Sequence, residues 1–167
     1  MTDIDVLARK IEEMASNLRF NTGLQIMYTG LLADKYANLR IKKYGKNRSR
    51  IDILHTLITH KGVLRPSDLS KMTFHSKQTV TKIVDGLVSD GLVTREPEGT
   101  DRRTKKVFVT KKGIQFVENS LPVTMDIAHE CMPSLTIQEL EQLNSVLKRI
   151  RNRVLNQMAN LGIYDSP

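Results

Sequence analysis

The sequence predicts a mostly α-helical protein with one small β-hairpin, and three observations predict it. Apolar residues recur at helical spacing along most of the 167 residues. A polar, cationic tip, Gly99 to Arg103, lies between strand-like segments at 92–97 and 105–110. A compact amphipathic helix comes just before them. A helix followed by a basic hairpin is the order of a winged helix-turn-helix, which places a helix and a cationic loop on DNA.

Composition and charge narrow the classes of protein to consider. The apolar fraction of 40% is enough for a core, and without tryptophan that core must be built from Leu, Ile, Val and Met. The net charge is +8, and residues 61–112 hold 12 basic and six acidic side chains. Residues 40–50 add six cations and no acid. A basic region attracts polyanions, of which nucleic acid is the commonest; the alternative is a protein that is basic without binding one.

Three other features of the sequence indicate the cellular compartment of the protein. The single cysteine, Cys131, rules out an internal disulfide. Residues 1–5 are acidic and lack a signal-peptide pattern. The longest uncharged run, 20–33, is too short and too polar to span a bilayer. We therefore expect a cytoplasmic protein with no membrane contact.

Two helices are predicted before residue 45. The first has apolar residues at alternating spacings of three and four, a heptad-like seam. Its seam residues are Ile4, Leu7, Ile11, Met14 and Leu18. Residues 21–23, Asn-Thr-Gly, are expected to interrupt the helical pattern, and a second helix then runs to about Lys43. Residues 44–47 are predicted to form its exit.

The middle of the chain carries the start and stop signals of short elements. The expected elements are a helix at 49–60 capped by Gly62, a short strand at 63–65, and a helix at 67–72 with Pro66 in its first turn. Ser76 is a good N-cap for the next helix, 76–90, and Gly91 ends it. The apolar stripe predicted to face the core consists of Val80, Ile83, Val84, Leu87 and Val88. The hairpin then runs from Leu92 to Thr110.

Two further helices are predicted after the hairpin. Thr110 can cap a helix that runs to about Met132, with a kink or break at Pro122. Thr136 and Glu139 have the spacing of a capping box, which opens the last helix. That helix carries a seam of Ile137, Leu140, Leu143, Leu147, Ile150, Val154 and Met158.

The seams at both ends of the chain predict a homodimer. Terminal helices of this length cannot all bury their apolar sides on so small a core, and a second copy of the chain is the natural cover. The alternative is packing over the central unit of the same chain. We divide the chain into N-terminal dimer helices at 1–45, a winged helix-turn-helix at 46–113, and C-terminal dimer helices at 114–167.

The helix at 76–90 offers candidate DNA-reading residues. Its polar face carries Gln78, Lys82, Asp85 and Ser89, flanked by Thr79 and Thr81, with Lys77 nearer the boundary. Gln can pair with adenine and Lys with guanine, and Thr can contact a thymine methyl or a phosphate. Ser76 and the first backbone N–H groups can hold a phosphate. An ordinary solvated helix surface would also be polar. The face therefore indicates DNA binding only in combination with the basic hairpin and the positive charge around it.

The hairpin supplies the second candidate contact. An arginine at its tip can enter the minor groove, where narrow A·T-rich segments concentrate negative potential. Asp101 can orient the guanidinium of Arg103 through a local salt bridge, while Arg102 and Lys105 are phosphate neighbours. Arg95, on the first strand, belongs to the same candidate set. The alternative is a solvated loop with a chance acid.

These residues identify a resemblance to the MarR family of transcription regulators. The wing pattern of that family, Asp-x-Arg-x-x-x-Val-x-Leu-Thr-x-x-Gly, is matched by Asp101, Arg103, Val107, Thr110 and Gly113, with Val109 in the Leu place. Residues 79–87 resemble its recognition helix, and order and spacing agree from about 24 to 154. The resemblance implies a homodimer built by the terminal helices and a wing arginine, Arg103, held by Asp101. The turn at 73–75, Lys106 and a longer segment before residue 20 depart from the family's pattern.

The resemblance also implies a partner beyond DNA. Many family members bind small, often aromatic, anionic effectors between the DNA-binding and dimer regions, and others sense oxidants through an N-terminal cysteine. This chain has no N-terminal cysteine, and Cys131 fits a small buried apolar residue better than a redox sensor. Tyr28, Tyr36 and Tyr44, eight residues apart, either line a pocket or pack in the core or dimer.

Three functional classes follow. The first is a dimeric, sequence-specific DNA-binding regulator, a repressor of a palindromic operator whose affinity an effector alters. The second is a non-catalytic winged-helix adaptor or a non-specific DNA-binding protein. The third, an enzyme, is not expected, because no nucleophile–base pair, phosphate loop, carboxylate pair, metal spacing or cofactor motif occurs.

Overall fold

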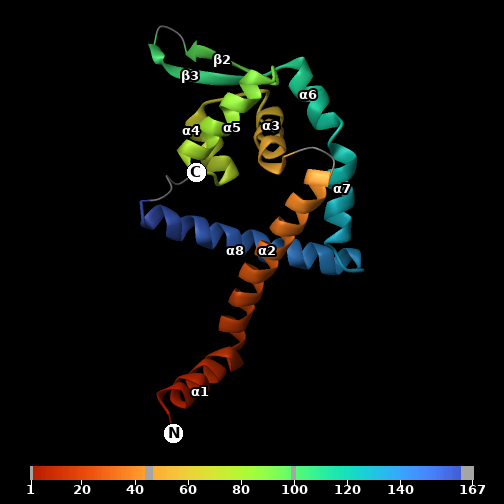
Figure 1. The fold of residues 1–167 in the computed structure, drawn as a ribbon. Coiled ribbons are helices and arrows are strands. Elements are labelled where there is room, and N and C mark those ends of the chain that lie inside the picture. Colours follow the sequence, from red (N-terminus) through yellow and green to blue (C-terminus); the bar gives the residue numbers. More distant parts are fainter. Residues whose placement is uncertain (1, 44–46, 99–100, 163–167) are drawn as a thin grey trace. The chain divides into compact units, whose positions relative to one another are not determined.

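A computed structural model describes residues 2–43, 47–98 and 101–162, and for residues 98 and 101–104 it describes the backbone alone (Figure 1). The chain divides into two compact units, Met1–Arg48 and Ser49–Pro167. The predicted fold class is confirmed, since the described residues are mostly helical and carry a small three-stranded antiparallel sheet. No helix in these ranges is long and apolar enough to cross a membrane.

The first unit consists of two helices, α1 (Asp3–Ser16) and α2 (Leu18–Lys43). A capping box opens α1, because the Thr2 N–H donates to the Asp5 carboxylate at 2.7 Å and the Asp5 N–H donates back to the Thr2 hydroxyl at 3.3 Å. None of the α1 residues is buried, so its predicted apolar seam faces solvent in the single chain.

The break between these helices lies at Asn17, so the interruption predicted at residues 21–23 is wrong. The Asn17 N–H donates to the Met14 carbonyl at 3.1 Å, which closes α1. The Asn17 side-chain oxygen accepts from the Phe20 N–H at 3.0 Å, which opens α2. One residue thus caps both helices, and Gly23 continues α2 without difficulty in a solvated position.

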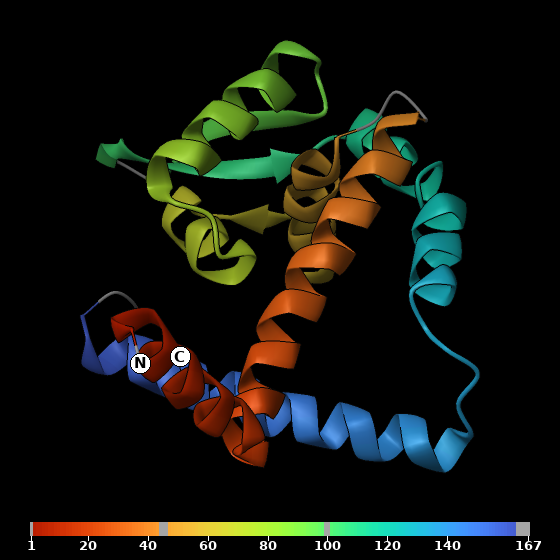
Figure 2. The same cartoon turned by 60° about the horizontal axis from the view of Figure 1, so that its bottom comes forward.

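The second unit holds α3 (Arg48–Thr59), which begins at the boundary between the units, and then β1 (Val63–Leu64), α4 (Pro66–Thr73) and α5 (Lys77–Ser89). The hairpin strands are β2 (Val93–Glu98) and β3 (Asp101–Val109), and the sheet order is β1-β3-β2 (Figure 2). The core of this unit lies among α3, α4, α5 and the sheet. Its fully buried members include Ile53, Leu54, Leu57, Leu69, Val80, Val84, Leu87 and Val107.

Most expected features are confirmed, including the strand at Val63, Pro66 in the first turn of α4 and the Ser76 cap, although α4 is one residue longer at each end than the predicted 67–72. The cap of α3 differs in detail, because Lys61 (φ 62°) takes the first left-handed position that was assigned to Gly62. Gly62 follows it and donates its N–H to the Leu57 carbonyl at 2.7 Å. The cap therefore spans two residues with positive φ.

Val88 was predicted to face the core and does not. Its side chain is 39% exposed, whereas Val80, Val84 and Leu87 are fully buried. Eight helical steps carry Val88 about 80° around the axis from Val80, to the edge of the buried stripe. Ile83, on the opposite edge, is half-buried and packs against the core.

Strand β2 is a free edge of the sheet, because β3 lies between it and β1. It pairs antiparallel with β3, with Val93 opposite Val109, Arg95 opposite Val107 and Pro97 opposite Lys105. The pairing becomes irregular between Pro97 and Glu98. A proline fits a strand only where the ladder does not need its nitrogen, so Pro97 suits this edge.

The helices after the hairpin are α6 (Lys111–Glu118), α7 (Leu121–Glu130) and α8 (Ile137–Asn160). The predicted break near Pro122 is confirmed, and it falls at Asn119 and Ser120. Ser120 is fully buried and donates its hydroxyl to the Phe116 carbonyl at 2.7 Å. The predicted capping box of Thr136 and Glu139 opens α8, and no residue of α8 is buried in the single chain.

Candidate nucleic-acid interface

The start of α5 is shaped by the turn that follows α4. Phe74 adopts a left-handed conformation, φ 57° and ψ 20°, and ends α4. The Ser70 hydroxyl donates to the His75 carbonyl at 2.7 Å and holds the turn against α4. Among residues 73–75, which depart from the family's usual residues, Phe74 is a bulky residue at positive φ, an uncommon conformation for such a side chain. Its side chain is 60% exposed, so the turn does not need to bury it. This turn delivers Ser76 to the N-cap position of the next helix, directly before Lys77.

Ser76 and Thr79 form the N-terminal cap of α5. The Ser76 hydroxyl accepts from the Thr79 N–H at 3.1 Å and shares a hydrogen bond of 2.8 Å with the Thr79 hydroxyl. The Thr81 hydroxyl donates to the Lys77 carbonyl at 2.9 Å. The hydroxyls of this turn are therefore engaged within the helix, although both threonines are exposed residues.

The outward face of α5 carries the predicted reading residues. Because Val80, Val84 and Leu87 anchor one side of the helix in the core, the opposite side is presented to solvent. The exposed residues are Ser76, Lys77, Gln78, Thr79, Thr81, Lys82, Asp85 and Ser89. Within the described part of the chain, Lys77, Gln78 and Lys82 make no side-chain hydrogen bond or ion pair. Their donors and acceptors are available to a ligand.

The hairpin is fixed to the core by its second strand. Val107 is fully buried, and Val109 packs against the core from a half-buried position. Lys105 is exposed on the same strand. The backbone of β3 includes Asp101, Arg102 and Arg103, but their side chains, and with them the predicted Asp101–Arg103 pair, lie outside the described residues.

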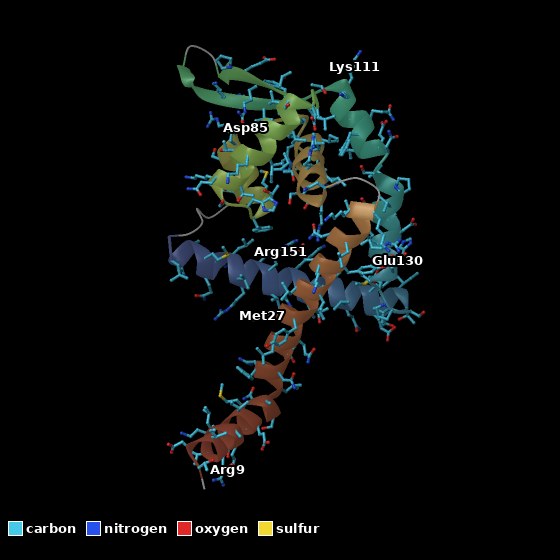
Figure 3. All side chains as sticks on the ribbon, viewed as in Figure 1. Arg9, Met27, Asp85, Lys111, Glu130 and Arg151 are labelled. Carbon is cyan, nitrogen blue, oxygen red and sulfur yellow. The ribbon has the colours of Figure 1, made fainter. Side chains whose placement is uncertain are left out.

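Arg95 has a partner that the sequence did not reveal. Its guanidinium forms an ion pair with the Asp85 carboxylate and also donates to the Thr81 carbonyl at 3.4 Å (Asp85 is labelled on α5 in Figure 3). The Arg95 side chain is 27% exposed and that of Asp85 55%. The strand period held a signal for this pair, because Arg95 lies two residues after the buried Val93 and so shares its face toward the helix layer.

A second set of contacts holds the end of α5. Arg50 of α3 forms an ion pair with Asp90, and Lys112 of α6 donates to the Asp90 carbonyl at 2.8 Å. Thr110 donates its hydroxyl to the Gly91 carbonyl at 2.8 Å, which secures the turn after the helix. Gly91 has φ +70°, so glycine suits this turn best. Sequence reasoning identified Gly91 and Thr110 but not the two cations that meet at Asp90.

The residues considered for sensing belong to different elements of the chain. Cys131 caps the C-terminus of α7 and is half-buried in the single chain. Tyr28 is exposed on α2, Tyr36 lies 5.9 Å beneath the Arg40 guanidinium, and Tyr44 lies outside the described residues. Among the described residues, no group of three or more His, Cys, Asp or Glu side chains could hold a metal ion.

Comparisons with known proteins agree with this geometry. The family model of the MarR family matches residues 44–104. The HTH-type transcriptional regulator YdgJ of Bacillus subtilis is 30% identical over 112 residues, which cover 67% of this chain and 68% of that protein. The transcriptional repressor MprA of Escherichia coli is 29% identical over 127 residues, covering 75% and 72%.

Solved structures extend the likeness to the fold. A mutant of MarR from Escherichia coli, complexed with operator DNA, superposes with a TM-score of 0.66 at 26% identity, covering 77% of this chain and 91% of that one. BpsR of Bordetella bronchiseptica, whose DNA binding is regulated by 6-hydroxynicotinic acid, superposes with a TM-score of 0.70 at 19% identity, covering 78% and 98%. The latter likeness is one of fold. The chain therefore belongs to the MarR family, and it is a DNA-binding transcriptional regulator.

Proposed function

We propose that the protein is a dimeric repressor that binds a palindromic operator through α5 and the β2–β3 hairpin. The observation that carries the proposal is the orientation of α5. Three fully buried residues, Val80, Val84 and Leu87, aim Gln78 and Lys82 outward with no partner in the described part of the chain. MprA is a repressor, and the MarR variant was solved on operator DNA, so this function has precedent among similar proteins.

The proposed contacts divide into base readers and phosphate holders. Gln78 reads adenine and Lys82 reads guanine in the major groove. The phosphate holders and groove contacts are Ser76, Lys77, Thr79, Thr81, Arg102, Arg103 and Lys105, with Asp101 orienting Arg103. Arg95 belongs to the same site, where it forms an ion pair with Asp85 of α5.

The dimer is proposed from the terminal helices. In the single chain neither α1 nor α8 buries a residue, although both carry apolar seams. Burying such seams against a second copy gives a two-fold dimer, which matches a palindromic site. We accordingly assign residues 1–45 and 114–167 to the dimer region and 46–113 to the DNA-binding domain.

An effector is proposed as a small aromatic or anionic molecule that changes the affinity for DNA. BpsR, with the same fold, is regulated by such a compound, 6-hydroxynicotinic acid. The proposed place of action is the cytoplasm, where DNA-binding repressors meet their operators. A thermal-shift screen of aromatic acids tests the effector, because a ligand that binds the native state raises the unfolding temperature.

The DNA-binding proposal is tested with a duplex selected from a random-sequence library by the wild-type protein. We expect Lys82→Ala to weaken binding to that duplex by about 1–3 kcal/mol and to relax selection at particular base pairs, and Gln78→Ala to do the same at other positions. Arg151→Ala on α8 (labelled in Figure 3) removes the same charge as Lys82→Ala from a helix outside the proposed interface. Gel-shift titration should leave this control within twofold of wild type.

Two outcomes would favour the alternative class, a winged-helix adaptor or a non-specific DNA-binding protein. One is a failure of the selection to enrich any sequence. The other is an equal loss of affinity for selected and random duplexes in Lys82→Ala, which would assign Lys82 to phosphates only.

A further inference from the structure

We propose that the Arg95–Asp85 ion pair is a brace that positions the recognition helix, so that Arg95 serves DNA recognition through α5 and not by contacting DNA. The inference rests on the proposed function of α5 as the reading helix. It gives Arg95 a role different from that of the cations at the hairpin tip, and it gives a role to Asp85, a carboxylate on the face that meets DNA.

The strand end of the brace is rigidly held. Arg95 is two residues beyond Val93, which is buried, and lies opposite Val107, which is fully buried. The Arg95 backbone is therefore part of the sheet that closes the core. Its guanidinium starts from a fixed point, which a side chain on a loop would lack.

The helix end of the brace spans one turn of α5. The guanidinium meets the Asp85 carboxylate with one nitrogen and the Thr81 carbonyl, four residues earlier, with the other. Residues four apart lie one above the other on a helix, so the planar fork of an arginine can engage both at once. A lysine ammonium carries its three donors on one nitrogen at the end of a flexible stem, so it lacks the fixed, separated nitrogens of this fork.

The location of Asp85 argues that the pair has a positional role. A carboxylate on a surface that approaches phosphates opposes binding, and an exposed ion pair contributes little to stability. The Arg95 side chain is nevertheless only 27% exposed, because it lies down on the helix instead of reaching outward as Lys82 does. The pair therefore serves to fix the position of α5 relative to β2.

The brace adds a second point of attachment between α5 and β2. The first is at the end of the helix, where the N–H of Leu92, the residue before β2, donates to the Leu87 carbonyl at 2.9 Å. The packing of Val80, Val84 and Leu87 sets which side of the helix faces the core, and two separated attachments to the strand segment hold its rotation more closely than one. Reading side chains must be held to within about 10–20° for productive contacts, so the rotation of α5 bears directly on base recognition.

Asp85→Ala separates the two possible roles of Arg95, because a brace and a phosphate contact predict opposite changes in DNA affinity. If Asp85 is part of a brace, its removal lowers affinity for the selected duplex by at least about tenfold, the size of one lost base contact, although the protein gains positive charge. If Arg95 instead contacts phosphate, removing Asp85 frees it, and affinity for selected and random duplexes rises together. That second result would overturn the proposal.

Arg95→Ala supplies the matching measurement. A brace predicts a loss on the selected duplex equal to that of Asp85→Ala, no further loss in the double variant, and an unchanged salt dependence of binding to a random duplex. A phosphate contact predicts a fall of about 0.9 in the slope of log affinity against log salt concentration. Arg95→Lys keeps the charge but not the fork, so the brace predicts that it fails to restore sequence discrimination.

Two controls keep the result separate from other causes. Glu96→Gln removes one negative charge from the neighbouring strand position, which has no ion pair in the described residues, and it should raise affinity for both duplexes slightly. Urea unfolding followed by circular dichroism identifies any variant that has lost its fold. If the wild-type protein selects no sequence, the proposed function fails, whereas selection by the wild type with a freed Arg95 in Asp85→Ala rejects only the brace.

Discussion

Gly113 lies in α6 against the backbone of Leu92, in the segment that leaves α5. A Cβ atom at this position would lie 2.2 Å from the Leu92 carbonyl oxygen and 2.9 Å from a Val109 methyl. The backbone of neither neighbour can move freely. The Leu92 carbonyl accepts hydrogen bonds from Thr110, and the Val109 N–H donates to the Gly62 carbonyl. The glycine of the wing pattern is thus required by packing between two segments.

Gly113→Ala is expected to lower the free energy of unfolding by about 1–3 kcal/mol, because the methyl group forces backbone displacement in a closed region. Urea unfolding followed by far-ultraviolet circular dichroism measures this, since the chain has no tryptophan to report by fluorescence. Gly86→Ala is the matched control. It lies in α5 with no atom near the new methyl group, and alanine should stabilise the helix by about 0.5–1 kcal/mol. Equal effects of the two substitutions would contradict the packing argument.

At the level of single residues, the sequence predicted well those positions whose role is local. Ser76, Thr110 and Thr136 cap helices through their own nearby backbone, so residue type and spacing suffice to identify them. Arg95 and Asp85 are ten residues apart on different elements, and their pairing depends on how a strand and a helix pack. A single sequence does not reveal such a distance, although the alternation after Val93 gave the correct face.

Among the elements, α8 begins with a capping box whose contribution to stability depends on pH. The Thr136 N–H and hydroxyl both donate to the Glu139 carboxylate at 2.8 Å. The backbone hydrogen bond, followed by the hydroxyl bond, lowers the pKa of Glu139 below its ordinary value. The stabilisation by this box is therefore complete above the ordinary glutamate pKa of about 4.3 and is lost as the pH falls through the lower folded value.

We expect Thr136→Val to raise the pKa of Glu139 part of the way toward that ordinary value, because the hydroxyl bond is lost and the backbone N–H remains. Carboxyl chemical shifts followed by NMR over an acid titration measure the change. Asp5 is an internal control, since the Thr2 N–H and hydroxyl lower its pKa in the same way at α1, and it should not respond. A Glu139 pKa that does not move in the variant would show that the hydroxyl bond does not form in solution.

Element boundaries show where sequence reasoning reached its limit. The helix at 49–60, the strand at 63–65, α5 and the hairpin followed from periodicity and from glycine and proline signals. The break between α1 and α2 did not, because residues 21–23 resemble an interruption, whereas a single asparagine, Asn17, offers caps in both directions. Residue type alone favours a break at a run of turn-forming residues, whereas the position of the break depends on which side chain can form the capping hydrogen bonds.

For the molecule as a whole, the apolar surface of the terminal helices leads to a prediction about assembly. Leu143 and Leu147 on α8 are 39% and 44% exposed in the single chain, and both belong to its seam. Leu143→Glu with Leu147→Glu should raise the dimer dissociation constant by more than about 100-fold, because two carboxylates would be buried at the proposed interface. Sedimentation equilibrium should then report the mass of one chain.

Val88→Glu is the control for that experiment. Val88 is as exposed as Leu143, at 39%, but it lies on α5 outside the proposed dimer region. It should leave the mass at two chains. A wild-type protein that sediments as a single chain at micromolar concentration would contradict the dimer.

The free edge of β2 has a consequence for how such a protein stays dispersed at high concentration. An uncovered strand edge invites strands of other molecules to add to the sheet, the first step of aggregation. Pro97 interrupts the row of donors along this edge, the exposed Glu96 places a charge beside it, and the pairing turns irregular at Glu98. These features therefore oppose the pairing of this edge with strands of other copies of the chain.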